Sequence, residues 1–388
     1  MAEAPVHPER GQSGVAAELA GGSVRIPPIE SELLWFDLLF APPPPSALAW
    51  TAALVSDSSA PGELEVRGVA GIRDRVAVVG RSAADVLIDG EPVLANLGPG
   101  NSFIIALDHE GRLAWARRST IDFARATQSA GSDLLVAGTD EDGDLVVQQW
   151  GADGNLLREH RWSCHAEMVG LAAAADNGYV LAANLRRPCA PDGKYLDDGA
   201  MIVGFNRSGP GRLEFWKGME VVDLDVASNG DALVARVDRA GNHALVRLGA
   251  DGRIRWSVGL GPRRAVQVDV DPVGRTFLAS DVDLTAWTAR GRSKWGAAES
   301  GISSLAAGRG WVAHAGAGSL LSMVRGTSGE VLLDWSEPRL SAGPIAATAD
   351  GDLIVSLSSV HEVAWENERP VARGSSGRPR VTIVRLKK

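Results

Sequence analysis

A tryptophan recurs at nearly constant intervals along most of this chain, and its spacing limits the possible folds more than any other feature. Each copy ends a unit that contains a short apolar segment, a turn with glycine, and a second short segment bearing the tryptophan. The copies are Trp115, Trp162, Trp216, Trp256, Trp295 and Trp335, at intervals of 47, 54, 40, 39 and 40 residues. One four-stranded blade of a β-propeller takes roughly 40–50 residues, so this period predicts a propeller.

Two more strands are predicted upstream of each tryptophan-bearing hairpin, which brings every repeat to four. One is apolar with alternation, and its copies begin at Arg75, Asp133, Gly178, Asp231, Arg275, Gly310 and Asp352. A segment of small residues precedes each copy, as in GLAAAAD from Gly170. Small side chains suit the innermost strand, because blades crowd together around the axis. We therefore expect a small inner strand, two apolar strands, and an outer strand with the tryptophan.

The two ends of the repeat region complement each other. The last repeat ends with VTIVRLK from Val381 and lacks an outer strand, whereas SALAWTAALV from Ser46 is an outer strand without its own repeat. Pairing them makes Trp50 the seventh copy and removes an exposed sheet edge. The sequence therefore predicts an all-β, seven-bladed β-propeller over residues 46–388, with the N-terminal strand closing the last blade.

The residues before the predicted propeller differ from it in composition. Residues 1–29 are polar and rich in proline, glycine and alanine, which is typical of a flexible tail. Residues 30–45 contain an apolar docking segment, ESELLWFDLLF, and a proline-rich spacer. The large side chains of this segment include Leu34, Trp35 and Phe36. Two alternatives stay open: docking on the propeller's own surface, or insertion into a groove of a partner protein.

Charge and hydropathy argue against several classes of partner. The chain has 39 Lys+Arg and 48 Asp+Glu residues, a formal net charge of −9, which argues against binding to nucleic acid or to an anionic membrane surface. Its apolar runs are too short to span a bilayer. The chain as given starts without a secretory signal, so a cytoplasmic location is expected, or a periplasmic or secreted one if a signal sequence was removed.

Three of the connections between the second and third strands of a blade are long: 81–101, 184–199 and about 358–380. In a propeller these connections lie on one face, and long insertions on a rigid scaffold commonly carry binding functions. Arginine, tyrosine and tryptophan supply much of the energy at protein interfaces. The candidate partner-binding residues in these loops are Arg186, Arg187, Tyr195, His361, Trp365, Glu366 and Arg369. The alternative is loop growth without any ligand.

The sequence contains two cysteines, Cys164 and Cys189, which the repeat pattern brings to the same face. A disulfide between them and a reduced pair both fit the sequence. Together with His165 they offer too few ligands, too irregularly spaced, for zinc. The motifs HExxH, GxSxG, GxxxxGK[ST] and GxGxxG are absent, so no catalytic residue, metal site or cofactor is predicted. This favours a protein without enzymatic activity, although a catalytic site assembled from several blades stays open.

Two stretches resemble known propeller repeats. The run DVLIDGEPVLANLGPGNSFIIALDHEGRLAWARR resembles the repeats of bacterial β-propeller proteins of the SBBP type, and LGADGRIRWSVGL is similar to the repeat of pyrroloquinoline-quinone-like propellers. The likeness covers roughly residues 46–388 and implies a propeller, but no chemistry. Quinoprotein dehydrogenases of the second family hold their cofactor with Ca²⁺ ligands and a ring of adjacent cysteines. No adjacent cysteine pair exists in this chain, so no cofactor is implied.

These observations favour a non-enzymatic scaffold that presents long loops on one propeller face to a protein partner, alone or within a larger assembly. The alternative is a glycan- or polymer-binding propeller, or a hydrolase, that uses the same face. A multivalent carbohydrate site needs aromatic platforms that repeat from blade to blade. The long loops contain few aromatic residues, which disfavours that alternative.

Overall fold

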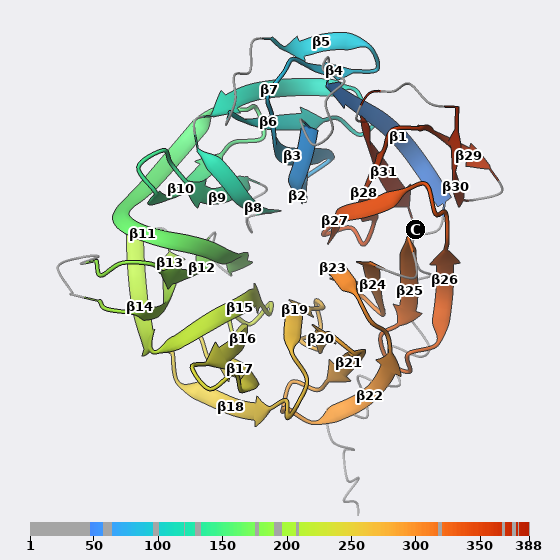
Figure 1. Ribbon diagram of the computed structural model, residues 1–388. Coiled ribbons are helices and arrows are strands. Elements are labelled where there is room, and N and C mark those ends of the chain that lie inside the picture. The colour runs from blue at the N-terminus through green and yellow to red at the C-terminus, as the bar shows by residue number, and fades with distance from the viewer. Residues whose placement is uncertain are drawn as a thin grey trace, which may run out of the picture. The chain divides into compact units, whose positions relative to one another are not determined.

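The computed structural model describes residues 47–56, 64–95, 101–119, 121–128, 133–174, 178–189, 196–206, 209–316, 320–366, 369–374, 378 and 380–387. All of them lie in the second of the two units, Met1–Ala41 and Pro42–Lys388, into which the chain divides. The docking segment with Leu34, Trp35 and Phe36 lies outside the described residues. Within them, sheets of β-strands stand around a common axis (Figure 1). No helix in this described part is long and apolar enough to cross a membrane.

Four of the sheets contain four antiparallel strands each, in the predicted order from the axis outward. The first consists of β2 (Leu64–Ile72), β3 (Arg75–Ser82), β6 (Ser102–Leu107) and β7 (Leu113–Ser119). The second consists of β15 (Met219–Val226), β16 (Ala232–Asp238), β17 (His243–Leu248) and β18 (Ile254–Gly259). The third consists of β19 (Ala265–Val270), β20 (Thr276–Ser280), β21 (Asp283–Trp287) and β22 (Ser293–Ala298). The fourth consists of β23 (Ile302–Gly308), β24 (Trp311–Gly316), β25 (Leu321–Arg325) and β26 (Val331–Trp335).

The two remaining large sheets are wider. One contains β8 (Asp122–Gln128), β9 (Leu134–Thr139), β10 (Asp144–Trp150), β11 (Leu156–Ala174), β12 (Gly178–Leu185), β13 (Gly199–Asn206) and β14 (Gly209–Lys217). The other, the closing sheet, has the order β27 (Ser341–Ala347), β28 (Leu353–Ser359), β31 (Arg380–Lys387), β1 (Ala47–Ser56), β4 (Val86–Ile88) and β5 (Glu91–Leu94). A separate hairpin joins β29 (Glu362–Glu366) to β30 (Arg369–Arg373).

The prediction of seven separate blades is wrong: counted as continuous sheets in the described structure, the propeller has six blades. The difference arises at β11, which is 19 residues long. Its first part pairs with β10 and its second part pairs with β12, so one seven-stranded sheet stands where the sequence predicted two sheets of four. Between Trp162 and Gly170 the sequence contains neither glycine nor proline. Nothing therefore interrupts the strand where a turn was expected.

The predicted closure by the N-terminal strand is confirmed. β1 pairs with β31 along its length, with Trp50 opposite Arg385. Its other edge pairs with β4, where Leu54 lies opposite Ile88. The connection 81–101 was expected to project from the loop face, but part of it forms the β4–β5 hairpin that extends the closing sheet. β1 is therefore an interior strand, held by hydrogen bonds on both edges.

At four of its positions, the repeated tryptophan clamps one sheet to the next. Trp115 in β7 donates a hydrogen bond from Nε1 to the carbonyl of Ala152, at 2.8 Å, in the β10–β11 turn of the neighbouring sheet. A Cβ on Gly154 would stand only 2.7 Å from the Trp115 ring, so the ring occupies the space that a side chain would need. Gly154 also has a φ of 79°, which other residues rarely adopt. The turn needs glycine for both reasons.

The same contact recurs around the ring. Trp256 donates to Ala289 at 2.9 Å and packs on Gly291, and Trp295 donates to Gly326 at 3.1 Å. Trp50 of the closing strand packs on Gly111 in the next sheet. At these four positions the periodic tryptophan is thus an inter-sheet clamp on a glycine turn, which we call the Trp–Gly clamp.

Replacing Gly291 with alanine tests the clamp, with Gly241→Ala as the matched control. Both glycines have a positive φ, of 75° and 80°, but a Cβ on Gly291 would stand 2.8 Å from the Trp256 ring whereas nothing lies within 4 Å of one on Gly241. Gly241→Ala should lose about 1 kcal/mol of unfolding free energy from backbone strain. Gly291→Ala should lose about 1–3 kcal/mol more from overpacking, measured by urea unfolding. Equal losses in the two variants would contradict the clamp.

Candidate functional site

Arg186 and Arg187 follow β12 on the loop face and differ in their surroundings. Arg186 forms an ion pair with Glu167 of β11 and a second with Glu220 of β15, at 3.7 Å. Its backbone N–H donates to the carbonyl of His165 at 2.8 Å. Arg187 is exposed and has no ion pair with any described residue. Arg186 therefore joins two sheets, and Arg187 is the one of the two that is available to a partner.

A disulfide between Cys164 and Cys189 fixes the start of the second long connection to β11, with the Cα atoms 5.1 Å apart. Cys189 also exchanges backbone hydrogen bonds with Leu196, at 3.0 and 2.6 Å. Beyond it, Asp197 pairs with Lys217 at 3.4 Å, and Asp198 pairs with Arg239. Tyr195 lies outside the described residues. The described parts of this connection are thus anchored at several points.

The third long connection forms the β29–β30 hairpin. Trp365 is half-buried and meets Trp335 of β26 edge-on, with ring centroids 5.1 Å apart. Arg373 donates from Nε to the carboxylate of Glu366 at 2.6 Å, which ties the two strands together. His361 contacts the carbonyl of Gly374 through Nδ1.

Beside this hairpin, Arg369 begins β30 at its tip. Its side chain is exposed and has no ion pair within the described part of the chain.

The candidate residues form two groups that do not meet. β12, which leads to Arg186 and Arg187, lies on the opposite side of the ring from β29 and β30 (Figure 1). A single partner site made of both groups would have to span the whole face. The hairpin group is the more compact, because its residues share one two-stranded sheet.

A groove of about 510 Å³ lies next to the hairpin, lined by residues that include Leu320, Leu340 and Glu337. The carboxylate of Glu337 accepts hydrogen bonds from the Arg339 side chain at 3.0 Å and from the backbone N–H of Ala372 in β30. The side-chain hydrogen bond from Arg339 is the main reason why the pKa of Glu337 is lowered from its usual value. The groove wall and β30 are therefore joined by this carboxylate.

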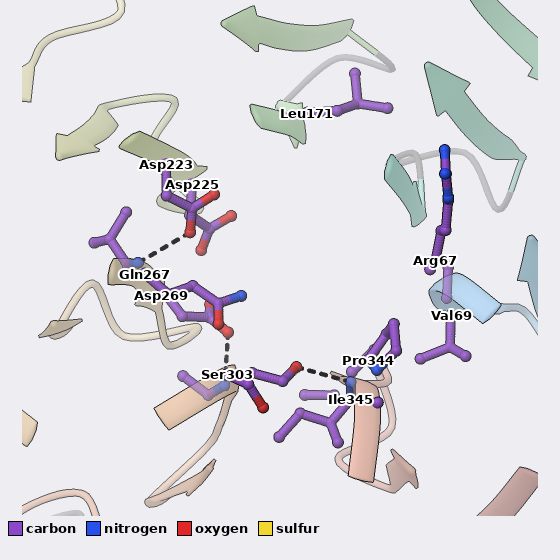
Figure 2. Close-up of a pocket in the computed structure, with 18 of the residues that line it drawn as sticks. Arg67, Val69, Leu171, Asp223, Asp225, Gln267, Asp269, Ser303, Pro344 and Ile345 are labelled. Carbon is purple, nitrogen blue, oxygen red and sulfur yellow. Dashed lines mark hydrogen bonds between the residues drawn. The ribbon is translucent and has the colours of Figure 1, made fainter. Parts of the chain in front are cut away.

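A cavity of about 770 Å³ follows the axis between the inner strands (Figure 2). Asp223 and Asp225 of β15 and Asp269 of β19 line one side of it, and Arg67 of β2 lies on the other (Figure 2). Arg67 contacts Asp122 of β8 at 2.5 Å. The cavity is thus polar on opposite walls, while its remaining lining is mostly small and apolar.

The axial carboxyl groups join consecutive inner strands. Asp223 and Asp225 accept hydrogen bonds from the backbone N–H groups of Val268 and Val270 in β19, at 3.0 and 2.7 Å. Asp269 accepts one from Ala307 in β23, at 2.9 Å. Because each carboxyl group receives a backbone donor from the neighbouring sheet, their first role is to hold the ring together.

Asp225 and Asp269 hydrogen-bond to each other in the cavity wall. Burial raises the pKa of Asp269 well above its usual value, and the nearby charge of Asp225 raises it further. Burial also raises the pKa of Asp225. A proton shared between two close carboxyl groups avoids the repulsion of two buried charges. The pair therefore keeps a proton at pH values where exposed carboxyl groups have lost theirs.

Sequence reasoning missed this polar axis. The inner segments VVDLDV and VQVDVD carry acids at alternate positions, which places them on one face of a strand. That pattern could have identified them, had the inner strands been searched for charge as well as for small size. Among the described residues, no group of three or more His, Cys, Asp and Glu side chains could hold a metal ion.

Comparison with solved structures shows the fold. The structure of streptogramin B lyase superposes with a TM-score of 0.53 at 11% identity, over 87% of this chain and 99% of that one. The β-propeller domain of Cps50 (Swd1) from Myceliophteria thermophila gives 0.54 at 15% identity, over 82% and 95%. The Dos1 propeller gives 0.51 at 10% identity, over 90% and 95%. No family model and no curated protein matches the sequence.

At such low identities, the likeness shows the fold alone. It confirms the prediction of a β-propeller. The resemblance to SBBP-type and pyrroloquinoline-quinone-like repeats stays a prediction, and so does a bacterial source.

Asp269→Asn tests the shared proton. A raised native pKa means that the native state binds more protons than the unfolded chain above about pH 4, so this pair's contribution to stability falls as pH rises. The uncharged amide can still accept from Ala307. The variant should therefore lose less stability than the wild type between about pH 5 and pH 8, measured by urea unfolding.

Asp238→Asn provides a control of opposite sign. Hydrogen bonds from Asn242 lower the pKa of Asp238, so this group stabilises the native state above its ordinary pKa and loses that effect as pH falls. Asp238→Asn should therefore lose stability at neutral pH. A loss of stability by Asp269→Asn that grows with pH would show that the ionised carboxylate, not the shared proton, holds the strands.

Proposed function

We propose that this chain is a protein-binding scaffold, and that its partner adds an extended segment to the free edge of β29. The propeller fold is compatible with such a role. The observation that carries the proposal is the unequal state of the two hairpin edges. The outward N–H of Ala372 in β30 is already occupied, because it donates to Glu337. No described strand other than β30 pairs with β29. An open strand edge is a template for β-strand addition.

The register indicates which backbone groups β29 offers. Trp365 lies opposite Pro370, which has no N–H, so these two residues cannot exchange a pair of hydrogen bonds. The backbone N–H and carbonyl of Trp365 therefore point away from β30, and by alternation those of Val363 do too. Two donors and two acceptors face outward from β29.

The hairpin is also firmly held, which favours binding. Trp365 packs on Trp335, and Arg373 pairs with Glu366 across the two strands. A strand that is already extended and fixed loses little conformational entropy when a partner pairs with it. The exposed guanidinium of Arg369 at the hairpin tip adds a contact for a carboxylate or carbonyl group of the partner.

The glycan- or polymer-binding alternative has less support. The described residues of the three long connections include no Tyr or Phe and a single Trp, Trp365. Its ring packs against that of Trp335. Stacking on sugars requires an exposed ring face. The aromatic platform that this alternative needs is therefore missing from the part of the loops that the structure describes.

Val363→Pro tests the free edge, because it removes one outward N–H of β29 while leaving the β29–β30 hydrogen bonds in place. The matched control is Glu362→Ala, which changes an exposed side chain on the same strand without changing the backbone. In pull-downs with the full chain from extracts of its source cells, Val363→Pro should lose the captured partner at least about tenfold and Glu362→Ala should keep it. Thermal unfolding should remain cooperative in both.

Partner capture that is equal in the two variants would contradict strand addition at β29. Binding to glycans on an array, unaffected by Val363→Pro, would replace the scaffold proposal with the carbohydrate alternative.

A further inference from the structure

Positive charge gathers on the outer turns of two neighbouring sheets, although the whole chain has a net charge of −9. Arg253 and Arg255 lie at the start of β18. Arg290 and Arg292 lie in the β21–β22 turn, and Lys294 follows in β22. All five residues are exposed. We call them the basic strip.

A Trp–Gly clamp brings the two halves of the basic strip together. Trp256, in the same strand as Arg255, donates to the carbonyl of Ala289 in the β21–β22 turn at 2.9 Å and packs on Gly291 of that turn. Arg255 and Arg290 are thus each next in sequence to a residue of this contact. β18 and β22 also follow one another as the outer strands of two neighbouring sheets (Figure 1). The five cations therefore share one rim.

The turn that carries Arg290 and Arg292 is fixed in place. Thr288 accepts hydrogen bonds through Oγ1 from the backbone N–H groups of both residues, at 3.3 and 3.1 Å. The buried Arg247 of the neighbouring sheet donates to Ala289 at 3.3 Å. Backbone positions that are fixed before binding reduce the entropy lost when a ligand binds.

The positive charge of the basic strip is largely uncompensated. Asp251 pairs with Arg255 at 3.1 Å. Arg253, Arg292 and Lys294 form no ion pair with any residue that the structure describes. In the equivalent β6–β7 turn, by contrast, Arg112 pairs with both Asp108 and Glu110. Three of the five cations in the basic strip thus have no ion pair within the described residues.

We propose that the basic strip binds an acidic segment of a protein partner, one with several Asp or Glu side chains close together. Guanidinium groups match carboxylates in shape and charge. Ile254 lies between Arg253 and Arg255 and is 55% exposed, which gives such a segment an apolar contact as well.

A short acidic peptide fits this surface better than nucleic acid or an anionic membrane. The strip spans two turns, and the acids Asp108 and Glu110 lie in the equivalent β6–β7 turn of a chain whose net charge is negative. A long polyanion or a flat anionic surface would meet that repulsion, whereas a short segment would not.

This inference goes beyond the proposed function and is independent of it. The basic strip lies on turns between the third and fourth strands of a sheet, whereas the β29–β30 hairpin connects a second strand to a third. In antiparallel sheets these two kinds of connection lie at opposite ends of the strands. The strip and the free edge of β29 are therefore on opposite faces, and variants in one leave the other intact.

Fluorescence anisotropy of fluorescein-labelled hexaglutamate tests the proposal, with the full chain at low salt. The strip variant is Arg290→Gln with Arg292→Gln and Lys294→Gln. The control variant, Arg81→Gln with Arg112→Gln and Arg118→Gln, removes the same number of charges from other exposed positions. We expect the strip variant to bind about tenfold more weakly than the wild type, and the control to differ by less than about twofold. Added salt should weaken wild-type binding.

Three results would overturn the proposal. The first is no measurable binding of hexaglutamate by the wild type, and the second is an equal loss in the strip and control variants. The third is tighter, strip-dependent binding of a single-stranded oligouridylate or of phosphatidylserine vesicles, which would assign the strip to nucleic acid or to membrane instead.

Discussion

The Trp–Gly clamp is the contact on which the rest of this propeller depends. A four-stranded sheet cannot bury both of its faces alone, so each sheet must pack closely on its neighbours. Three tryptophans meet this need: Trp115, Trp256 and Trp295. The ring of each packs on a turn of the next sheet, and its Nε1 donates to a backbone carbonyl of that turn at 2.8–3.1 Å. The ring fits only because the turn residue beneath it is a glycine. Each of these inter-sheet contacts therefore needs a tryptophan on one sheet and a glycine on the other.

Closure extends the same contact across the junction of the chain's two ends. Trp50 belongs to a strand that pairs with the C-terminal β31, and its ring packs on Gly111 in the next sheet. The β4–β5 hairpin then covers the strand's other edge. At the axis, Asp223, Asp225 and Asp269 accept backbone hydrogen bonds from neighbouring inner strands. Aromatic rings thus join sheets at the outer rim, and carboxyl groups join β15, β19 and β23 at the inner rim.

Those two sets of contacts differ in how readily the sequence reveals them. The clamp requires a rare large residue at a fixed distance from glycine, so it repeats visibly and predicted both the propeller and its closure. The double sheet depends on the absence of a break between Trp162 and Gly170, and an absence is easily overlooked beside a strong period. The axial acids were missed because their partners are backbone N–H groups, which any sequence supplies. The contact that occupies the Ala372 N–H of β30 depends on Glu337, which only tertiary structure brings there.

The clamp also explains why the two ends of the strands differ in variability. Each clamp engages a turn between the third and fourth strands, so the described turns at Gly111, Gly154 and Gly291 are short and similar in conformation. Connections between the second and third strands make no such contact. They range from the short β9–β10 turn to the insertion that contains β29 and β30. Charge can change on the clamped turns while their shape cannot, whereas both length and shape can change on the opposite face. A basic strip on rigid turns and a hairpin with a free edge are the kinds of surface that these two constraints allow.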